Sequence, residues 1–263
     1  AHTDFLGISS LRTDYLVGLH DPFQLSSIDL QRQSRNRFFL QGADQDSFEN
    51  LVKNCQNIIT LDLLLSSYHR ISIPNLNHLT NLRHLSLNIL EHNESFEKLW
   101  KMLADFSKQH KNLTYLSLNL KTGHIREENN KSIELFFDAI SDSLTTLLLS
   151  FGATTLEKPC LKIFSKNLSN LQKLKSLYLK NFPFTELSKA SIPCGLEQLK
   201  LNINGNTTAK SLESILKGKT KLEKLFLEVK SFEKNLNFSQ AFSSLTELKD
   251  LELIIESFPK KNW

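Results

Sequence analysis

Apolar residues recur along the chain in one short pattern, L-x-x-L-x-L, which appears eight times between Ile58 and Leu253, with Ile at the first place of the first copy. Positions 4 and 6 are leucine in every copy, whereas positions 3, 5 and 7 are mostly polar. This alternation predicts a short β-strand with one buried face. The position 4 residues are Leu61, Leu85, Leu116, Leu147, Leu177, Leu199, Leu225 and Leu251, in steps of 24, 31, 31, 30, 22, 26 and 26 residues. Eight copies at this spacing indicate a repeated structural unit.

Position 8 returns to the apolar side in seven copies, and only Asn181 breaks that column. Between the strands, apolar residues recur at the spacing of one helix face. These stripes are Phe96, Leu99, Leu103 and Phe106; Ile133, Phe136, Phe137 and Ile140; Leu161, Phe164 and Leu168; and Leu212, Ile215 and Leu216. A strand followed by a returning helix, stacked on its copies, builds a parallel sheet with the helices outside. We therefore predict an α/β solenoid, curved because helices occupy more width than strands.

The repeated phrase resembles the leucine-rich-repeat family from about Ile58 to Ile255. The steps of 30 and 31 residues look like its longer, ribonuclease-inhibitor-like class, and the steps of 22 to 26 residues look like shorter classes. The phrase "LSLNL" is similar to leucine-rich arrays in ciliate proteins. The resemblance implies a curved horseshoe with a concave sheet and convex helices. One departure is that the Asn usual at position 9 occurs only as Asn204.

The pattern divides the chain into three parts. Residues 58–255 form the repeat domain, preceded by an amino-terminal arm and capping region (1–57) and followed by a carboxyl-terminal cap or tail (256–263). The exposed ends of such a stack need caps. The division therefore predicts one continuous core closed at both ends.

Candidate caps are visible at both ends. A helix beginning at Asp46 would turn Phe48 and Leu51 inward. Two upstream segments, "FQLSSIDL" and "RFFLQG", compete for an additional strand, and the pattern does not decide between them. At the other end, Phe258 and Trp263 are expected to close the core.

Composition narrows the class of protein. The 263 residues are 40% hydrophobic, enough for a substantial core, and no run of about eighteen apolar residues predicts a membrane span. The start has no Met and lacks the order of a secretory signal, which leaves open a removed leader or a longer product. Cys55, Cys160 and Cys194 are scattered, without CxxC, so neither a disulfide framework nor a zinc finger is indicated. We expect an intracellular protein, cytoplasmic by default, with mitochondrial, ciliary and nuclear locations left open.

No catalytic motif is visible in the sequence. The glycines Gly152, Gly195, Gly205 and Gly218 are isolated, so no phosphate-binding loop is formed. All eight histidines lie at or before His124, but those at 69, 78, 84 and 92 lack HxxxH or HExxH spacing. We therefore predict a protein that is not an enzyme and that has no cofactor, metal or small-molecule substrate.

The outward positions of the strands predict a binding surface on the open, concave sheet. Aromatic side chains there have no core to fill, and exposed aromatics beside charges are typical of interface anchors. Two alternatives are that neighbouring side chains cover these rings or that the rings satisfy strand propensity. His84, at position 3, is expected beside Tyr115 of the next copy. The predicted contact residues are Tyr115, Tyr178, Phe226, His84, Lys200 and Lys224.

Charge is unevenly distributed. All seven arginines precede residue 127, and from Lys158 onward there are 18 lysines against 10 acidic residues, an excess of eight positive charges. We predict a non-catalytic interaction or scaffold subunit that binds protein partners in a larger assembly. The alternative is an RNA-associated subunit of a ribonucleoprotein that uses its lysine-rich half against phosphates. Glu residues are interspersed with Lys in "KGKTKLEKLFLEVKSFEK", which favours an ordinary solvated face.

Overall fold

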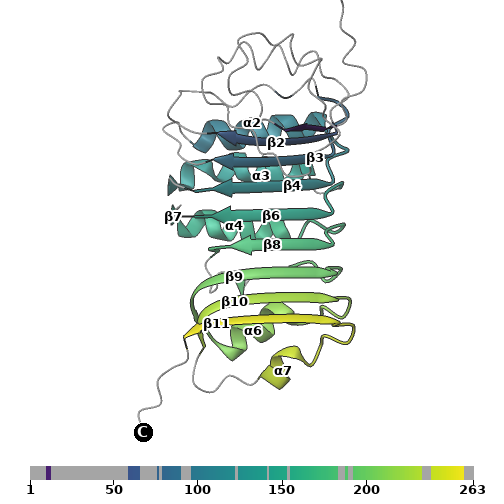
Figure 1. Cartoon of the computed structure of the whole chain (residues 1–263). Coiled ribbons are helices and arrows are strands. Elements are labelled where there is room, and N and C mark those ends of the chain that lie inside the picture. Colours follow the sequence, from purple (N-terminus) through teal and green to yellow (C-terminus); the bar gives the residue numbers. More distant parts are fainter. Residues whose placement is uncertain are drawn as a thin grey trace, which may run out of the picture.

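A computed structural model of the chain describes residues 10–12, 59–65, 76, 79–89, 96–121, 124–140, 142–152, 155–182, 187–188, 192–232 and 238–257. Within these residues, nine parallel strands form one sheet in the order β1-β2-β3-β4-β6-β8-β9-β10-β11. The sheet is open, because β1 and β11 lie at opposite edges of the described part. The helices lie behind it on one face (Figure 1). We call that face the helix-covered face and the opposite one the open face.

Each new strand is added beside the previous strand of the same sheet, so the chain advances along the sheet in one direction. The strands are β1 (Ser10–Arg12), β2 (Thr60–Leu65), β3 (His84–Ile89), β4 (Tyr115–Leu120), β6 (Thr146–Phe151), β8 (Ser176–Lys180), β9 (Gln198–Thr207), β10 (Lys224–Phe232) and β11 (Asp250–Ser257). The helices are α2 (Phe96–Gln109), α3 (Asn130–Ile140), α4 (Lys158–Leu168), α6 (Ala209–Leu216) and α7 (Phe238–Phe242).

The strand pairing confirms the register expected from the leucine pattern. Leu61 pairs with Leu85 and Leu85 with Leu116, and the same row continues strand by strand to Leu225 and Leu251. Burial alternates along β3, β4 and β6, with every second side chain buried. The alternation follows from successive side chains pointing to opposite faces of a sheet. Positions 3, 5 and 7 therefore lie on the open face.

The helical stripes face the sheet as predicted. Their buried members include Leu99, Leu103 and Phe106 of α2, Ile133, Phe136, Phe137 and Ile140 of α3, Leu161, Phe164 and Leu168 of α4, and Leu212, Ile215 and Leu216 of α6. Local signals fix where the helices begin. Thr208 accepts a hydrogen bond from the backbone N–H of Ser211 (3.0 Å) at the start of α6. Pro159 lies in the first turn of α4, where its missing N–H removes no helical hydrogen bond.

An aromatic cluster fills the centre of the core between the sheet and the helices. Phe164 lies at its middle, with ring centroids 5.5 Å from Trp100 and Phe151 and 5.6 Å from Phe137. Phe182 joins the cluster at 5.9 Å from Phe151. Most of these pairs are tilted or edge-on, the geometry that aromatic rings prefer. The rings therefore connect four consecutive repeats into one core.

Asn181 breaks the position 8 column because the chain turns there. Its φ is 59°, in the left-handed region that Asn tolerates better than most residues. Its N–H donates to the carbonyl oxygen of Asn202 (3.1 Å), and its side-chain amide donates to that of Gly152 (3.4 Å). The turn places Phe182 in the core instead.

Leu251 departs from the prediction that every position 4 leucine is buried. The other seven are 0–2% exposed, whereas Leu251 is 49% exposed. Position 7 of the same strand, Ile254, is 42% exposed. In earlier units the next strand lies beside position 4, but the described part of the chain has no element after β11. The physical reason is therefore the position of β11 at the edge of the sheet.

A second, two-stranded parallel sheet was not predicted. It pairs β5 (His124–Ile125) with β7 (Thr155–Leu156), beyond the ends of β4 and β6. A short 3-10 helix, η4 (Glu127–Asn129), follows β5. Nearby, Gly152 packs so closely that an added Cβ would lie 2.8 Å from the carbonyl oxygen of Lys121. Glycine there allows neighbouring repeats to approach through their backbones.

The two ends are described only in part. Ser10–Arg12 pairs with β2, although the sequence indicated no strand there within the predicted arm. The candidate strands "FQLSSIDL" and "RFFLQG", the helix from Asp46, and the capping residues Phe258 and Trp263 lie outside the described residues. At the carboxyl end, β11 continues to Ser257, two residues beyond the predicted boundary, because Ser257 still pairs with Ser231. No helix in the described part is long and apolar enough to cross a membrane.

Candidate functional site

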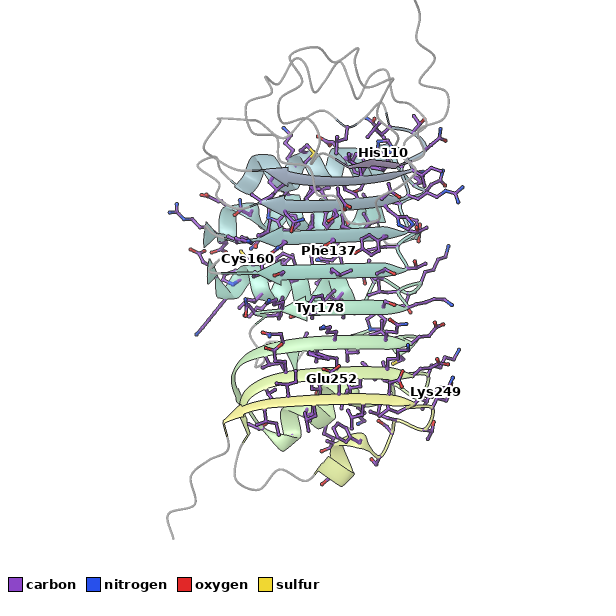
Figure 2. All side chains as sticks on the ribbon, in the orientation of Figure 1. His110, Phe137, Cys160, Tyr178, Lys249 and Glu252 are labelled. Atoms are coloured by element: carbon purple, nitrogen blue, oxygen red, sulfur yellow. The ribbon has the colours of Figure 1, made fainter. Side chains whose placement is uncertain are left out.

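All six predicted contact residues lie on the open face of the sheet. The position 5 row runs Asp62, Ser86, Ser117, Leu148, Tyr178, Lys200, Phe226 and Glu252 across neighbouring strands. The position 3 row, beside it, holds His84, Tyr115 and Lys224. Figure 2 shows Tyr178 and Glu252 in the middle of their strands on this face. The parallel register therefore brings together residues that are 22 to 31 positions apart in the sequence.

A hollow of about 1180 Å³ lies on the open face over β4 to β11. Five of the six predicted residues line it: Tyr115, Tyr178, Lys200, Lys224 and Phe226. The sixth, His84, lies just outside and stacks on Tyr115, with ring centroids 5.5 Å apart and planes inclined by 19°. The prediction that His84 lies beside Tyr115 is therefore confirmed. Leu148 adds to the lining an apolar side chain that was not among the predicted contact residues.

Lys200 lies between two aromatic rings. Its Nζ is 3.9 Å from the ring centroid of Phe226 and 5.2 Å from that of Tyr178. Both distances fall within the range in which a cation is attracted to a ring face. No ion pair between Lys200 and a carboxylate occurs in the described part of the chain. The two rings therefore contact the positive charge of Lys200, but no carboxylate among the described residues neutralises it.

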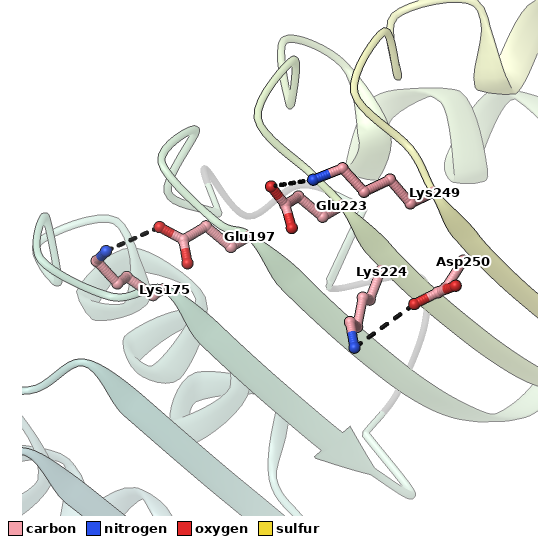
Figure 3. Close-up of polar contacts among 6 residues, drawn as sticks. All are labelled: Lys175, Glu197, Glu223, Lys224, Lys249 and Asp250. Atoms are coloured by element: carbon pink, nitrogen blue, oxygen red, sulfur yellow. Dashed lines mark hydrogen bonds and ion pairs between the residues drawn. The ribbon is translucent and has the colours of Figure 1, made fainter.

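Three ion pairs join neighbouring strands around this region (Figure 3). Lys224 Nζ lies 3.5 Å from Asp250 on the open face. Beside the amino-terminal ends of the strands, the ammonium of Lys175 donates to the carboxylate of Glu197, and the ammonium of Lys249 donates to that of Glu223, each at 2.8 Å. These hydrogen bonds raise the pKa of both lysines. Because all six side chains are substantially exposed, the pairs fix charge positions more than they add stability.

The open face changes in charge from one end to the other. Over β3 and β4 it is neutral and polar, and the amide of Asn119 donates to that of Asn88 (2.9 Å). Lys180 and Lys200 give β8 and β9 a positive charge, because no acidic residue occupies positions 3, 5 or 7 of these strands. Acidic residues then dominate the last two strands, with Glu228, Asp250 and Glu252.

The two tyrosines of the hollow remain protonated at neutral pH. Burial raises the pKa of Tyr115, and the charge of Asp62 acts in the same direction. Burial also raises the pKa of Tyr178, with a smaller contribution from Glu228. Each phenol therefore offers a ring and a neutral hydroxyl to a ligand.

The described residues contain neither a cluster of metal ligands nor a cluster of reactive thiols. Among these residues, no group of three or more His, Cys, Asp or Glu side chains is close enough to hold a metal ion. The histidines at 69, 78 and 92 lie outside them. Cys160 is buried, its thiol donates to the carbonyl oxygen of Ile125 (3.6 Å), and burial raises its pKa to about 11. Cys160 is therefore a poor nucleophile.

Two buried basic residues were not predicted from the sequence. His110 and Lys219 are 2% and 3% exposed, three residues before the first leucine of a unit. Leu79 and Leu171 occupy the equivalent place in other units and are buried there. The ammonium of Lys219 donates to the carbonyl oxygen of Ile192 (3.1 Å), and burial lowers its pKa. A basic residue at a place that three other units fill with leucine was the signal that could have identified both.

His110 should make folding stability depend on pH. Burial lowers its pKa below the ordinary value of 6.5, and the backbone of Leu76 opposes this only in part. Neither ring nitrogen of His110, which Figure 2 labels, has a hydrogen-bond partner with good geometry among the described residues. Below pH 6.5 the unfolded chain therefore binds more protons at this site than the folded chain, so its contribution to stability decreases as the pH falls.

The measurement is urea unfolding at several pH values between about 7.5 and 5, comparing the natural chain with His110→Leu. We expect the free energy of unfolding to fall less steeply with acidification in the variant. Equal slopes for the two proteins would show that His110 titrates normally in the folded state.

The chain was also compared with known proteins. No protein-family model matches it, and no curated protein matches it.

Proposed function

We propose that this chain is a non-catalytic protein-interaction or scaffold subunit, built as a leucine-rich-repeat solenoid, that binds a protein partner through the open face. The observation that carries the proposal is the hollow in which Tyr178, Lys200 and Phe226 lie side by side. Aromatic side chains next to a cation are enriched at the centres of protein interfaces. The scattered spacing of the cysteines supports an intracellular location as part of the same proposal.

The leucine-rich-repeat assignment rests on the leucine register and on the layered arrangement. Equivalent leucines pair strand by strand, and the strands of the main sheet all run parallel, with helices on one face (Figure 1). In a solenoid each repeat contacts only its neighbours, which leaves a long face available for a partner. The open face fits that use because its outward residues do not belong to the core.

The aromatic residues provide the test. Native complexes would be isolated with the tagged chain, and binding of the recovered partner would then be titrated against Tyr115→Ala, Tyr178→Ala and Phe226→Ala. At least one of these changes should weaken binding by about 2 kcal/mol or more, because a few aromatic anchors often dominate an interface.

Leu135→Ala is the matched control, because Leu135 is an exposed apolar residue (39%) on α3 of the helix-covered face. Melting temperatures would verify that each variant is folded. If the three aromatic variants are folded and bind as tightly as the natural chain, the open face is not the binding surface.

A second candidate function is RNA binding on the helix-covered face. Lys158, Lys162 and Lys166 recur at i, i+4 and i+8 along α4 and are exposed, although Lys166 also lies 3.7 Å from Glu134. Such a row would contact phosphates. Affinity for a single-stranded RNA would then fall steeply with salt, and Lys162→Glu would weaken it. An affinity that is insensitive to both changes would contradict this candidate.

A further inference from the structure

The charges along the position 5 row determine what kind of partner segment fits the hollow. We infer that the open face binds an extended segment in the polyproline II conformation, in which a carboxylate and a cation are three residues apart and an apolar side chain lies between them. This inference rests on the proposed function and specifies the chemistry of its partner.

Lys200 determines the place of the carboxylate. Its ammonium group lies against Tyr178 and Phe226 and has no carboxylate partner in the described part of the chain. A partner carboxylate can approach the side of the ammonium that the rings leave open, because Lys200 is exposed to solvent. A partner lysine or arginine cannot use the same two rings, because Lys200 already occupies the space between them. The rings themselves contribute apolar contact on both sides of the charge.

Glu252 determines the place of the cation. It follows Phe226 in the same row, and Asp250 and Glu228 lie on the adjacent outward rows of the last two strands. Asp250 is already 3.5 Å from Lys224, whereas no ion pair of Glu252 occurs among the described residues. A positive side chain of the partner is therefore favoured over β11, and a negative one is repelled.

The spacing follows from sheet geometry. Lys200 and Glu252 are two strands apart, which corresponds to about 10 Å at about 4.8 Å per strand. A segment in the polyproline II conformation advances about 3.1 Å per residue with three residues per turn, so side chains three residues apart point to the same side and lie about 9 Å apart. The two residues between them pass over Phe226, and an apolar side chain on either of them can contact its ring. The order is directional, since reversing the two charges would place like charges together at both ends.

The experiment uses the full chain and a displayed library of random peptides about twelve residues long. Peptides would be selected in parallel on the natural chain, on the charge-exchanged variant Lys200→Glu with Glu252→Lys, and on Phe226→Ala. We expect enriched peptides on the natural chain to show the carboxylate-to-cation spacing at least about tenfold above the library, and the charge-exchanged variant to select peptides with the two charges exchanged. Single-stranded RNA would be included as a competitor.

The outcomes separate the two proposals. If Phe226→Ala loses the enriched peptides while the charge-exchanged variant keeps the same ones, binding uses the open face but the charge order is wrong. If all three proteins select the same peptides, or no peptide is enriched above a blank surface, the open face is not a peptide-binding surface and both proposals fail. Displacement of the peptides by RNA at low salt would show that Lys200 serves phosphates, and would overturn the inference. Lys200→Gln replaces the charge-exchanged variant if the latter does not fold, and it should lose the enrichment of carboxylates over β9.

Discussion

Replacing Phe164 with alanine is expected to lower the free energy of unfolding by about 3–5 kcal/mol. Phe164 is fully buried, and its ring lies at the centre of the aromatic cluster. Its ring centroid is 5.5 Å from those of Trp100 and Phe151, 5.6 Å from that of Phe137 and 6.3 Å from that of Phe182. Removing the ring leaves a cavity that four aromatic neighbours on different elements cannot fill by small shifts.

The matched control is Lys162→Ala, two residues earlier on α4 and exposed to solvent. Denaturant unfolding followed by circular dichroism would measure both variants. The control should lie within about 0.5 kcal/mol of the natural chain. A loss of similar size for both residues would indicate that α4 presents a different face to the sheet.

Replacing Leu116 with alanine is expected to cost about 2–5 kcal/mol. Leu116 is fully buried at position 4 of β4, between Leu85 and Leu147 in the neighbouring strands. A shortened side chain removes contacts with both neighbours. Because the same row continues through the sheet, the cavity would lie in the middle of the stack.

Thr114→Ala tests the register on the same segment. Thr114 is partly exposed, and its hydroxyl donates a long hydrogen bond (3.3 Å) to the carbonyl oxygen of Arg83. Losing such a bond costs about 0.5–1.5 kcal/mol. The midpoint of urea unfolding should therefore shift much less for Thr114→Ala than for Leu116→Ala. Similar shifts would contradict the placement of Leu116 in the core and of Thr114 outside it, just before β4 begins.

Much of the sheet could be predicted from the sequence because its signal is periodic. Leucine at positions 4 and 6 fixes both the strand and its register, since a slip of one residue would expose every leucine. The stripes on α3 and α4 are equally regular. In contrast, Ser10–Arg12 and the β5–β7 pair are two or three residues long, too short for any period to appear. The exposure of Leu251 depends on whether another element packs against β11, and a pattern within one unit does not contain that information.

The sequence predicts which residues of the candidate site share a row, but it does not predict how the side chains of Lys200, Tyr178 and Phe226 contact one another. Alternation placed Tyr178, Lys200 and Phe226 on the open face, and the register placed them next to one another. The position of the Lys200 ammonium between the two rings depends on side-chain torsions, which a pattern of residue types does not specify. His110 and Lys219 were missed for a different reason, because polar residues were assumed to be exposed.

Leu251 is half exposed because β11 is an edge strand, and β11 should therefore open locally more easily than the central strands. Among the described residues, strand β11 pairs only with β10, and its inward side chains are only partly covered. Strands β4 and β6 are paired on both sides and lie over the aromatic cluster. Detaching β11 therefore breaks one ladder and exposes less apolar surface than detaching β6, which breaks two ladders and opens the core. Amide protons of β11 should consequently exchange with deuterium faster than those of the central strands β4 and β6, so that local opening is easier at this edge than in the middle of the sheet.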